Sequence, residues 1–176
     1  MGAQIHDPAL VEQFCLGGNS TFTIVAKESQ TRFTFKIQAP KDANGFFFVK
    51  LLDGPDNWAN YQYIGFIRDG EFRHGGAKAK PGADAPSVGA FGWFWRNRNG
   101  KALDHMEFWH EGKCAKCARK LTVPESVYTG FGPDCAAMLG IPWVKHVVSS
   151  QLALGADLDA TSRAVLGGMN ESDGYR

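Results

Sequence analysis

The feature that most constrains this chain is a group of three cysteines between residues 110 and 135, where the sequence reads H-E-G-K-C-A-K-C, then 17 residues, then C. Cys114 and Cys117 have the two-residue spacing that lets two thiolates on one tight turn reach the same zinc ion. Cys135 follows a glycine-rich return and Pro133, so it lies at the expected start of a helix, where the helix dipole stabilises a thiolate. The pattern predicts one zinc ion bound by these three cysteines.

A fourth ligand is expected because zinc in structural sites is four-coordinate. His110 is the preferred candidate, since it lies only four residues before Cys114. The alternatives, which the sequence leaves open, are His105, His74, His146 and Cys15. Three thiolates and one histidine would close the coordination shell, and a closed shell is typical of a structural ion rather than a catalytic one.

The Cys-x-x-Cys spacing also occurs in thioredoxin-like redox proteins, where it follows a strand and opens a helix in an α/β fold. Here the preceding strands have an antiparallel pattern, and Arg119 to Pro124 favours a strand or turn after the motif. Zinc binding is therefore preferred to redox chemistry. The remaining cysteine, Cys15, is predicted to be a small buried residue.

The segment from Phe108 to Ala136 resembles a family of uncharacterised bacterial, plasmid and phage proteins that share a small domain of unknown function. That family's pattern is C-x-x-C-G-R-x-L-T-x-P-E-S followed by G-x-G-P-x-C. The matching positions are Cys114, Cys117, Arg119, Lys120, Leu121, Pro124, Ser126, Gly130, Gly132, Pro133 and Cys135. Ala118 replaces the family's usual glycine, and this departure removes no ligand. The resemblance covers most of residues 20 to 140 and implies zinc binding and a mobile-element setting, but no biochemical activity.

The fold is predicted from an alternation of apolar and polar residues in the first half of the chain. Four antiparallel strands are expected at residues 21–26, 32–38, 46–52 and 61–68, with Gly, Pro, Asp and Asn residues between them. A helix from Pro86 to Arg98 has apolar residues at helical spacing, so one side of it should pack on the sheet. The expected class is α+β: an antiparallel sheet of about four to six strands, a packed helix, an appended zinc-knuckle module and a C-terminal helix.

The expected organisation follows from these elements. It comprises an N-terminal arm at 1–20, the sheet and helix at 21–104, a zinc-binding module at 105–140, a C-terminal helical segment at 141–168 and a disordered tail at 169–176. A polar, Gly-rich stretch from His74 to Ala85 is expected to be a mobile loop.

Charge and hydropathy exclude several classes of protein. The 19 Lys and Arg residues nearly balance the 18 Asp and Glu residues, so any surface that attracts nucleic acid must be local. The sequence has no apolar run near the ~20 residues of a membrane span, and its first residues lack the pattern of a signal peptide. A location in the cytoplasm of a bacterial host is expected, with no membrane partner.

Enzymatic activity is not predicted, although the sequence leaves the question open. The chain contains no phosphate-binding loop, no G-x-S-x-G and no H-E-x-x-H. The zinc-deaminase order of His-x-Glu before Pro-Cys-x-x-Cys is also absent. A non-catalytic protein is therefore favoured.

Two binding functions compete. In the first, basic side chains contact the phosphates of nucleic acid, preferably single-stranded, while aromatic side chains such as Trp58, Tyr61, Tyr63 and Trp93 stack on bases. The candidate cations are Lys113, Lys116, Arg119, Lys120, Arg96, Arg98, Arg73, Lys78 and Lys80. In the second, a phage counter-defence or host-takeover protein binds a host protein through a sheet edge or the Trp-rich helix. Two observations argue against nucleic-acid binding. The cations of the zinc knuckle can simply balance the negative charge of the thiolates, and the aromatic side chains can belong to the core.

Overall fold

The computed structural model describes residues 2–42, 45–56 and 59–142. Trp58 therefore lies outside the described residues. So do the predicted C-terminal helical segment, apart from its first two residues, and the predicted tail at 169–176.

Seven strands form one sheet in the order β1-β7-β2-β3-β4-β5-β6, and every neighbouring pair is antiparallel. The strands are β1 (Ala3–Gln4), β2 (Asn19–Ala26), β3 (Arg32–Gln38), β4 (Phe46–Leu52), β5 (Tyr61–Arg68), β6 (Glu71–His74) and β7 (Met106–His110). The α+β class and all four predicted strands are confirmed, while the number of strands exceeds the expected four to six.

The strand β6 arises from a turn of only two residues. Asp69 and Gly70 both have positive φ, 54° and 77°, as the tightest hairpin turns require. The chain consequently folds back at once and pairs Glu71 with Arg68. The strand β6 was not predicted. Its last residue, His74, is the first residue of the expected loop, which also contains the 3-10 helix η1 (Gly76–Lys78).

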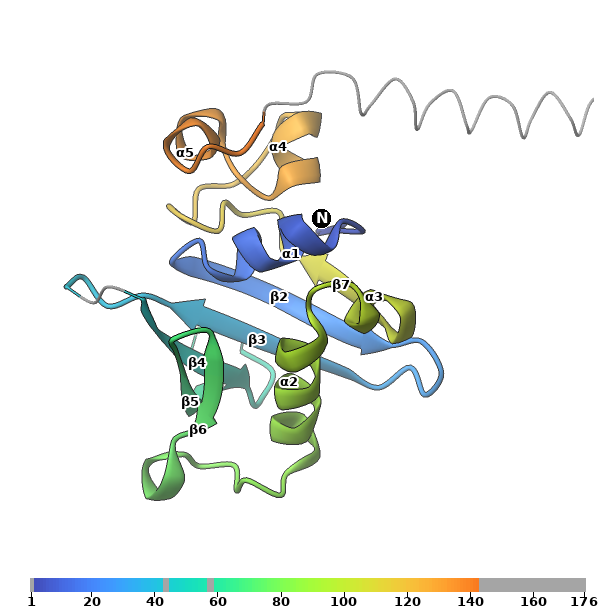
Figure 1. Cartoon of the computed structure of the whole chain (residues 1–176), viewed down its shortest axis with the longest axis vertical. Helices are drawn as coiled ribbons and strands as arrows, with labels where there is room; N and C mark the ends of the chain where they lie inside the picture. The colour runs from blue at the N-terminus through green and yellow to red at the C-terminus, as the bar shows by residue number, and fades with distance from the viewer. Residues whose placement is uncertain (1, 43–44, 57–58, 143–176) are drawn as a thin grey trace, which may run out of the picture. The chain divides into compact units, whose positions relative to one another are not determined.

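One face of the sheet is covered by two helices, α1 (Pro8–Cys15) and α2 (Pro86–Asn97) (Figure 1). Rings from these helices meet rings from the sheet: the Phe22–Phe94 centroids lie 5.8 Å apart and the Phe35–Phe91 centroids 5.0 Å apart. Trp95 of α2 is only 1% exposed. Phe91, Phe94 and Trp95 of this helix therefore belong to the core, and Trp93 alone of its aromatics is half-buried.

The segment after residue 105 is joined to the rest of the protein by a strand of the sheet. After α3 (Lys101–His105), strand β7 pairs with β2 along its full length. The Asn19 backbone N–H donates to the Ala115 carbonyl at 2.7 Å, and a Cβ at Gly130 would lie 2.3 Å from the Phe14 ring. The cysteine-bearing turn is thus packed directly against α1 and the start of β2.

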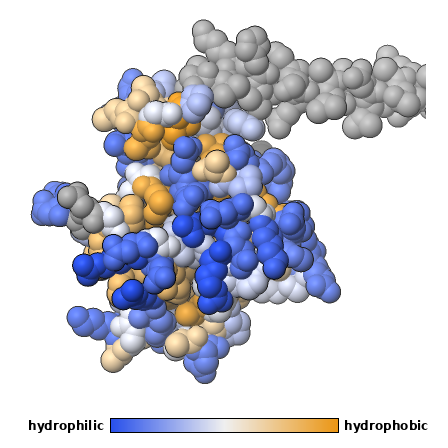
Figure 2. Space-filling view, in the orientation of Figure 1, coloured by the Kyte–Doolittle hydropathy of each residue, from blue (hydrophilic) through white to orange (hydrophobic). Residues whose placement is uncertain are grey.

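Two short helices complete the described chain, α4 (Pro124–Thr129) and the predicted α5 (Pro133–Met138). Figure 2 shows that apolar residues reach the surface at this end of the molecule. Val123, Met138 and Leu139 are the exposed ones here, at 44%, 69% and 41%. Across the described ranges, every helix is too short or too polar to cross a bilayer.

Candidate metal centre and the positions of the cations

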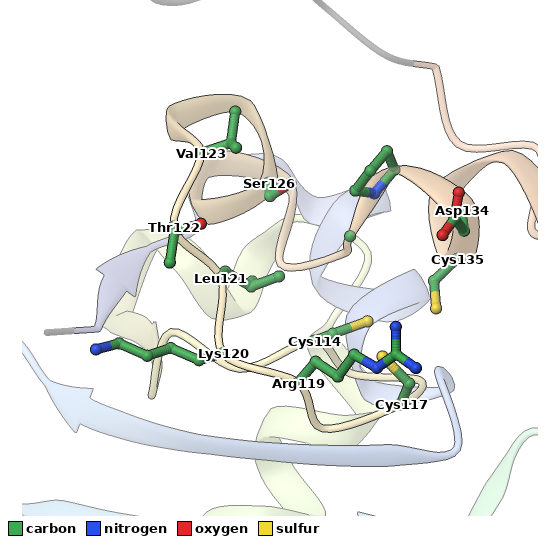
Figure 3. A pocket seen from close by; sticks show the side chains of 12 residues that line it. Cys114, Cys117, Arg119, Lys120, Leu121, Thr122, Val123, Ser126, Asp134 and Cys135 are labelled. Atoms are coloured by element: carbon green, nitrogen blue, oxygen red, sulfur yellow. The ribbon is translucent and has the colours of Figure 1, made fainter.

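Cys114, Cys117 and Cys135 converge in space, with their sulfur atoms all within 4.8 Å of one another (Figure 3). The first two belong to the turn after β7, and the third lies in the first turn of α5. Cys114 and Cys135 are buried, whereas Cys117 is exposed. The three thiols are therefore close enough to bind one metal ion.

Backbone hydrogen bonds set the shape of the turn. The Ala118 N–H donates to the Cys114 carbonyl and the Cys114 N–H donates to the Arg119 carbonyl, each at 2.9 Å. Ala118 closes the turn with φ at +59°, a left-handed conformation that suits glycine better than alanine. This is the position at which the resembling sequence pattern has glycine. The turn retains its geometry with alanine, at the cost of local strain.

The electrostatics of the cluster favour a thiolate at Cys114. Burial opposes ionisation of this thiol, but the N–H groups of Cys117, Gly132 and Lys116 donate to its sulfur, so its pKa lies below the ordinary value. For Cys135, burial and then the neighbouring sulfurs raise the pKa to about 12. One thiolate thus forms readily, and a bound cation would offset the charge repulsion among all three.

His110 lies outside this cluster, which corrects its prediction as the fourth ligand. Its ring is 2% exposed and packs 5.3 Å from the Phe14 ring. The Gly112 N–H donates to Nδ1 at 3.0 Å, so Nε2 carries the proton and donates to the Val127 carbonyl at 2.7 Å. Both ring nitrogens are thus occupied, and His110 ties β7 to α4 outside the cysteine cluster.

The other candidates for a fourth ligand also lie apart from the three sulfurs, so far as they are described. His74 accepts from the Gly76 N–H and bonds to the Pro81 carbonyl, and His105 contacts the Trp93 ring. Cys15 is fully buried in α1, as predicted, and burial raises its pKa well above the ordinary value. His146 falls beyond the described residues.

The cluster opens onto a small cavity of about 170 Å³. The cavity is lined by the three cysteines together with Arg119, Lys120, Leu121, Thr122, Val123, Ser126, Gly132, Pro133 and Asp134. Figure 3 shows the Arg119 side chain extending toward the sulfur atoms of Cys117 and Cys135. Soft thiolate donors suit a borderline-soft cation such as zinc, whereas calcium and magnesium prefer oxygen ligands.

The predicted cations fall into separate groups. Lys116, Arg119 and Lys120 are on the cysteine turn, and the last two are exposed. Lys113 forms an ion pair with Glu111 at 3.3 Å. Arg96 is exposed on α2, on the helix-covered side of the sheet.

Arg98 is not available to a phosphate, which corrects its prediction as a nucleic-acid contact. Its Nη2 forms an ion pair with Glu12 at 2.8 Å, and its Nη1 donates to the Trp95 carbonyl at 2.7 Å. The guanidinium lies 4.2 Å from the Trp95 ring centroid, and only 15% of the side chain is exposed. Arg98 therefore holds α1 and α2 together.

The remaining predicted cations lie toward the other edge of the sheet. Arg73 is on the edge strand β6, with Glu71 at 3.5 Å, and Lys78 and Lys80 are exposed in or near η1. Since β7 and β6 are separated by four strands, the cysteine turn and these cations are far apart in the sheet. They do not form one compact site.

Two lysines that the sequence analysis missed lie between these groups. Lys36 of β3 and Lys50 of β4 are directly paired across the sheet. Burial and then Lys50 lower the pKa of Lys36, Glu111 raises it, and Lys113 lowers it with a smaller effect. The alternation of apolar and polar residues puts both lysines on the polar side of their strands, and this could have been recognised from the sequence. Only the strand register places them side by side.

The comparisons with known proteins add one finding. A family of unknown function (DUF6011) matches residues 105–140, about a fifth of the chain, and this span contains β7, the cysteine turn, α4, α5 and the whole cavity lining. The chain is similar to that family over the metal-centre segment alone. Neither the curated proteins nor the solved structures gave a match.

Proposed function

We propose that this protein is a non-catalytic, zinc-binding protein that binds single-stranded nucleic acid. The convergence of Cys114, Cys117 and Cys135 within 4.8 Å is the observation that carries the proposal. The resemblance found in the sequence would place the protein with phage and plasmid proteins that act in the bacterial cytoplasm.

The zinc ion would be structural. The segment that bears the cysteines contains two helices of six residues each, which are too short to be stable by themselves. A metal bound by these cysteines would connect two pieces of chain, the turn after β7 and the first residues of α5. The three thiolates would hold the ion, and it would supply a cross-link.

Metal content tests this part of the proposal. Purified protein should contain about one zinc per chain, and Cys114→Ser or Cys135→Ser should lose the metal and lower the melting temperature. Cys15→Ala is the matched control, because this cysteine is equally buried but outside the cluster. Metal-free wild-type protein with an unchanged melting temperature would sink the zinc assignment.

Nucleic-acid binding is supported by the exposed cations of the cysteine turn. Arg119 and Lys120 are exposed and the half-buried Lys116 lies on the same turn, so the three cations could contact the phosphates of one strand. Three such contacts to a single strand would give a slope of log K against log salt of about −2. Binding should then weaken about 16-fold between 50 and 200 mM salt.

Fluorescence anisotropy with labelled single-stranded DNA, duplex DNA and RNA measures this directly. Single strands are expected to bind most tightly, and Arg119→Gln with Lys120→Gln should weaken binding and flatten the salt slope. Arg96→Gln is the matched control, since it removes an exposed cation from α2, outside the cysteine turn. If no nucleic acid binds at low salt, this part of the proposal is lost.

A further inference from the structure

The sheet has two unlike faces. One is covered by α1 and α2, whereas no helix within the described residues covers the other, which we call the open face (Figure 1). Its side chains come from alternate residues of each strand, opposite in direction to the buried Phe22, Phe35 and Val49. The composition of the open face is therefore not determined by packing in the core.

Aromatic rings cluster at one part of the open face. Phe48 pairs with Phe66 across β4 and β5, and Phe46 stacks on Phe66 with centroids 5.2 Å apart. The Phe48 ring lies 6.0 Å from the Tyr63 ring, edge to face, and Phe48 is 37% exposed. Such a group of rings on a solvent-facing sheet offers flat apolar surfaces to a ligand.

The aromatic cluster lines a groove of about 640 Å³. The lining consists of Phe46, Phe48, Tyr63, Phe66, Gly75, Ala77 and Lys78. The residues of η1 therefore form one wall, and the exposed Lys78 lies at that wall. The volume falls within the range of small-ligand sites, which is ample for a nucleobase.

A row of basic residues runs beside this groove. The strand register places Lys36 next to Lys50, and Lys50 next to Tyr63. Like charges directly opposite on a sheet are unfavourable by themselves. Lys50 Nζ donates to Gln38 Oε1 at 3.0 Å and Lys36 Nζ lies 5.6 Å from the Tyr61 ring centroid, so both ammonium groups are held on this face.

The open face also connects the two groups of cations that were predicted from the sequence. Arg73 is paired with Phe66 at the β6 side, and at the other side both Glu111 and, with a smaller effect, Lys113 are close enough to Lys36 to shift its pKa. The acidic residues nearest these ends are already engaged, Glu71 with Arg73 and Glu111 with Lys113. Lys36 and Lys50 therefore lie on a path from the cysteine turn to the groove.

We propose that a single strand of nucleic acid lies across the open face, with bases stacked on Phe48 and Tyr63 and phosphates beside Lys36 and Lys50. Rings combined with cations fit unpaired bases joined by phosphates, whereas a duplex would hide its base faces. This inference rests on the proposed function and adds the surface that performs it. The cysteine turn then guides one end of the strand.

The test uses the full chain and a labelled oligothymidine of about 15 nucleotides at low salt. Phe48→Ala should weaken binding between about 5-fold and about 100-fold, the range for loss of one stacked base. Lys50→Gln should reduce the salt slope by about 0.7, the value for one phosphate contact on a single strand. Lys50→Gln keeps the side chain's apolar stem, so it tests the proposal even if Phe48→Ala folds poorly.

The control is Met138→Ala, which removes an equally apolar and more exposed side chain from α5. If the wild type binds and the open-face variants bind equally well while Arg119→Gln weakens binding, the open face is excluded and the proposed function stands. If the wild type binds no oligonucleotide, both fail. A third outcome would also overturn the inference. If the wild type binds no oligonucleotide but binds a polypeptide, and Phe48→Ala abolishes that binding, the open face serves a protein partner.

Discussion

The sheet body and the cysteine segment are stabilised in different ways. In the body, the rings of Phe22, Phe94 and Phe108 stack on one another between the sheet and α2, with centroids 4.6 to 5.8 Å apart. In the cysteine segment, α4 and α5 have six residues each and surround three thiols with few large apolar side chains. The body has a core that hydrophobic burial can stabilise, whereas the smaller segment needs another source of stability.

Removing the metal should separate these two regions most clearly. In the zinc-loaded protein treated with a chelator, amide hydrogen exchange is expected to speed up strongly in residues 112–139, while the amides of β2 to β5 stay protected. Exchange measured peptide by peptide would show this. If β2 and β5 lose protection together with the cysteine turn, the two regions are one cooperative unit and the contrast is false.

Truncating a core side chain should instead destabilise the sheet body. Phe94→Ala should lower the free energy of unfolding by about 3 to 5 kcal/mol, because it removes a ring that is 1% exposed and packed against three others. Urea unfolding of the zinc-loaded protein measures this free energy. Met138→Ala, at a 69% exposed position, should change the same quantity by less than about 0.5 kcal/mol.

His110 joins the two regions, so its replacement should have an intermediate effect. His110→Gln should lower the free energy of unfolding by about 1 to 3 kcal/mol through the loss of a buried hydrogen-bonded ring. The zinc content should stay unchanged, since the ring nitrogens bond to Gly112 and Val127. Loss of zinc in this variant would restore His110 as a ligand.

The same residue gives a dependence on pH. Burial, only partly offset by the bond to Val127, lowers the pKa of His110 below 6.5. The unfolded chain therefore takes up a proton near pH 6.5 that the folded chain does not, and the free energy of unfolding falls as the pH falls from about 6.5. Unfolding curves at pH 7.5 and 5.5 should show a smaller pH effect in His110→Gln, because protonation of the thiols is common to both proteins.

The smallest expected effect concerns strain in the cysteine turn. Ala118→Gly should raise the free energy of unfolding by about 1 kcal/mol or less, because glycine adopts φ of +59° without strain but gains freedom when unfolded. The reverse substitution at a second left-handed position, Gly130→Ala, should have the opposite effect. Its φ is +76° and the new Cβ would lie 2.3 Å from the Phe14 ring, so the free energy of unfolding should fall. Thermal melting of zinc-loaded protein distinguishes these signs.

Local patterns predicted the local structure well. The alternating strands, the helix beginning at Pro86 and the helix beginning at Pro133 all lie where the sequence indicates. The strand β6 was missed although Asp69-Gly70 is a strong hairpin signal, because the residues after it resemble a loop. The two-residue β1 has no pattern of its own and exists only because β7 offers it a partner.

The sequence by itself determined most of the elements and the three cysteines of the candidate site, because strand alternation, turn residues and Cys-x-x-Cys spacing act over a few residues. Only the tertiary structure decided that His110 binds backbone groups outside the cysteine cluster, and that Arg98 is held by Glu12 across 86 positions of the chain. It also placed Lys36 beside Lys50 and next to Tyr63. Such contacts depend on strand register and on the packing of distant segments, which no short-range pattern encodes.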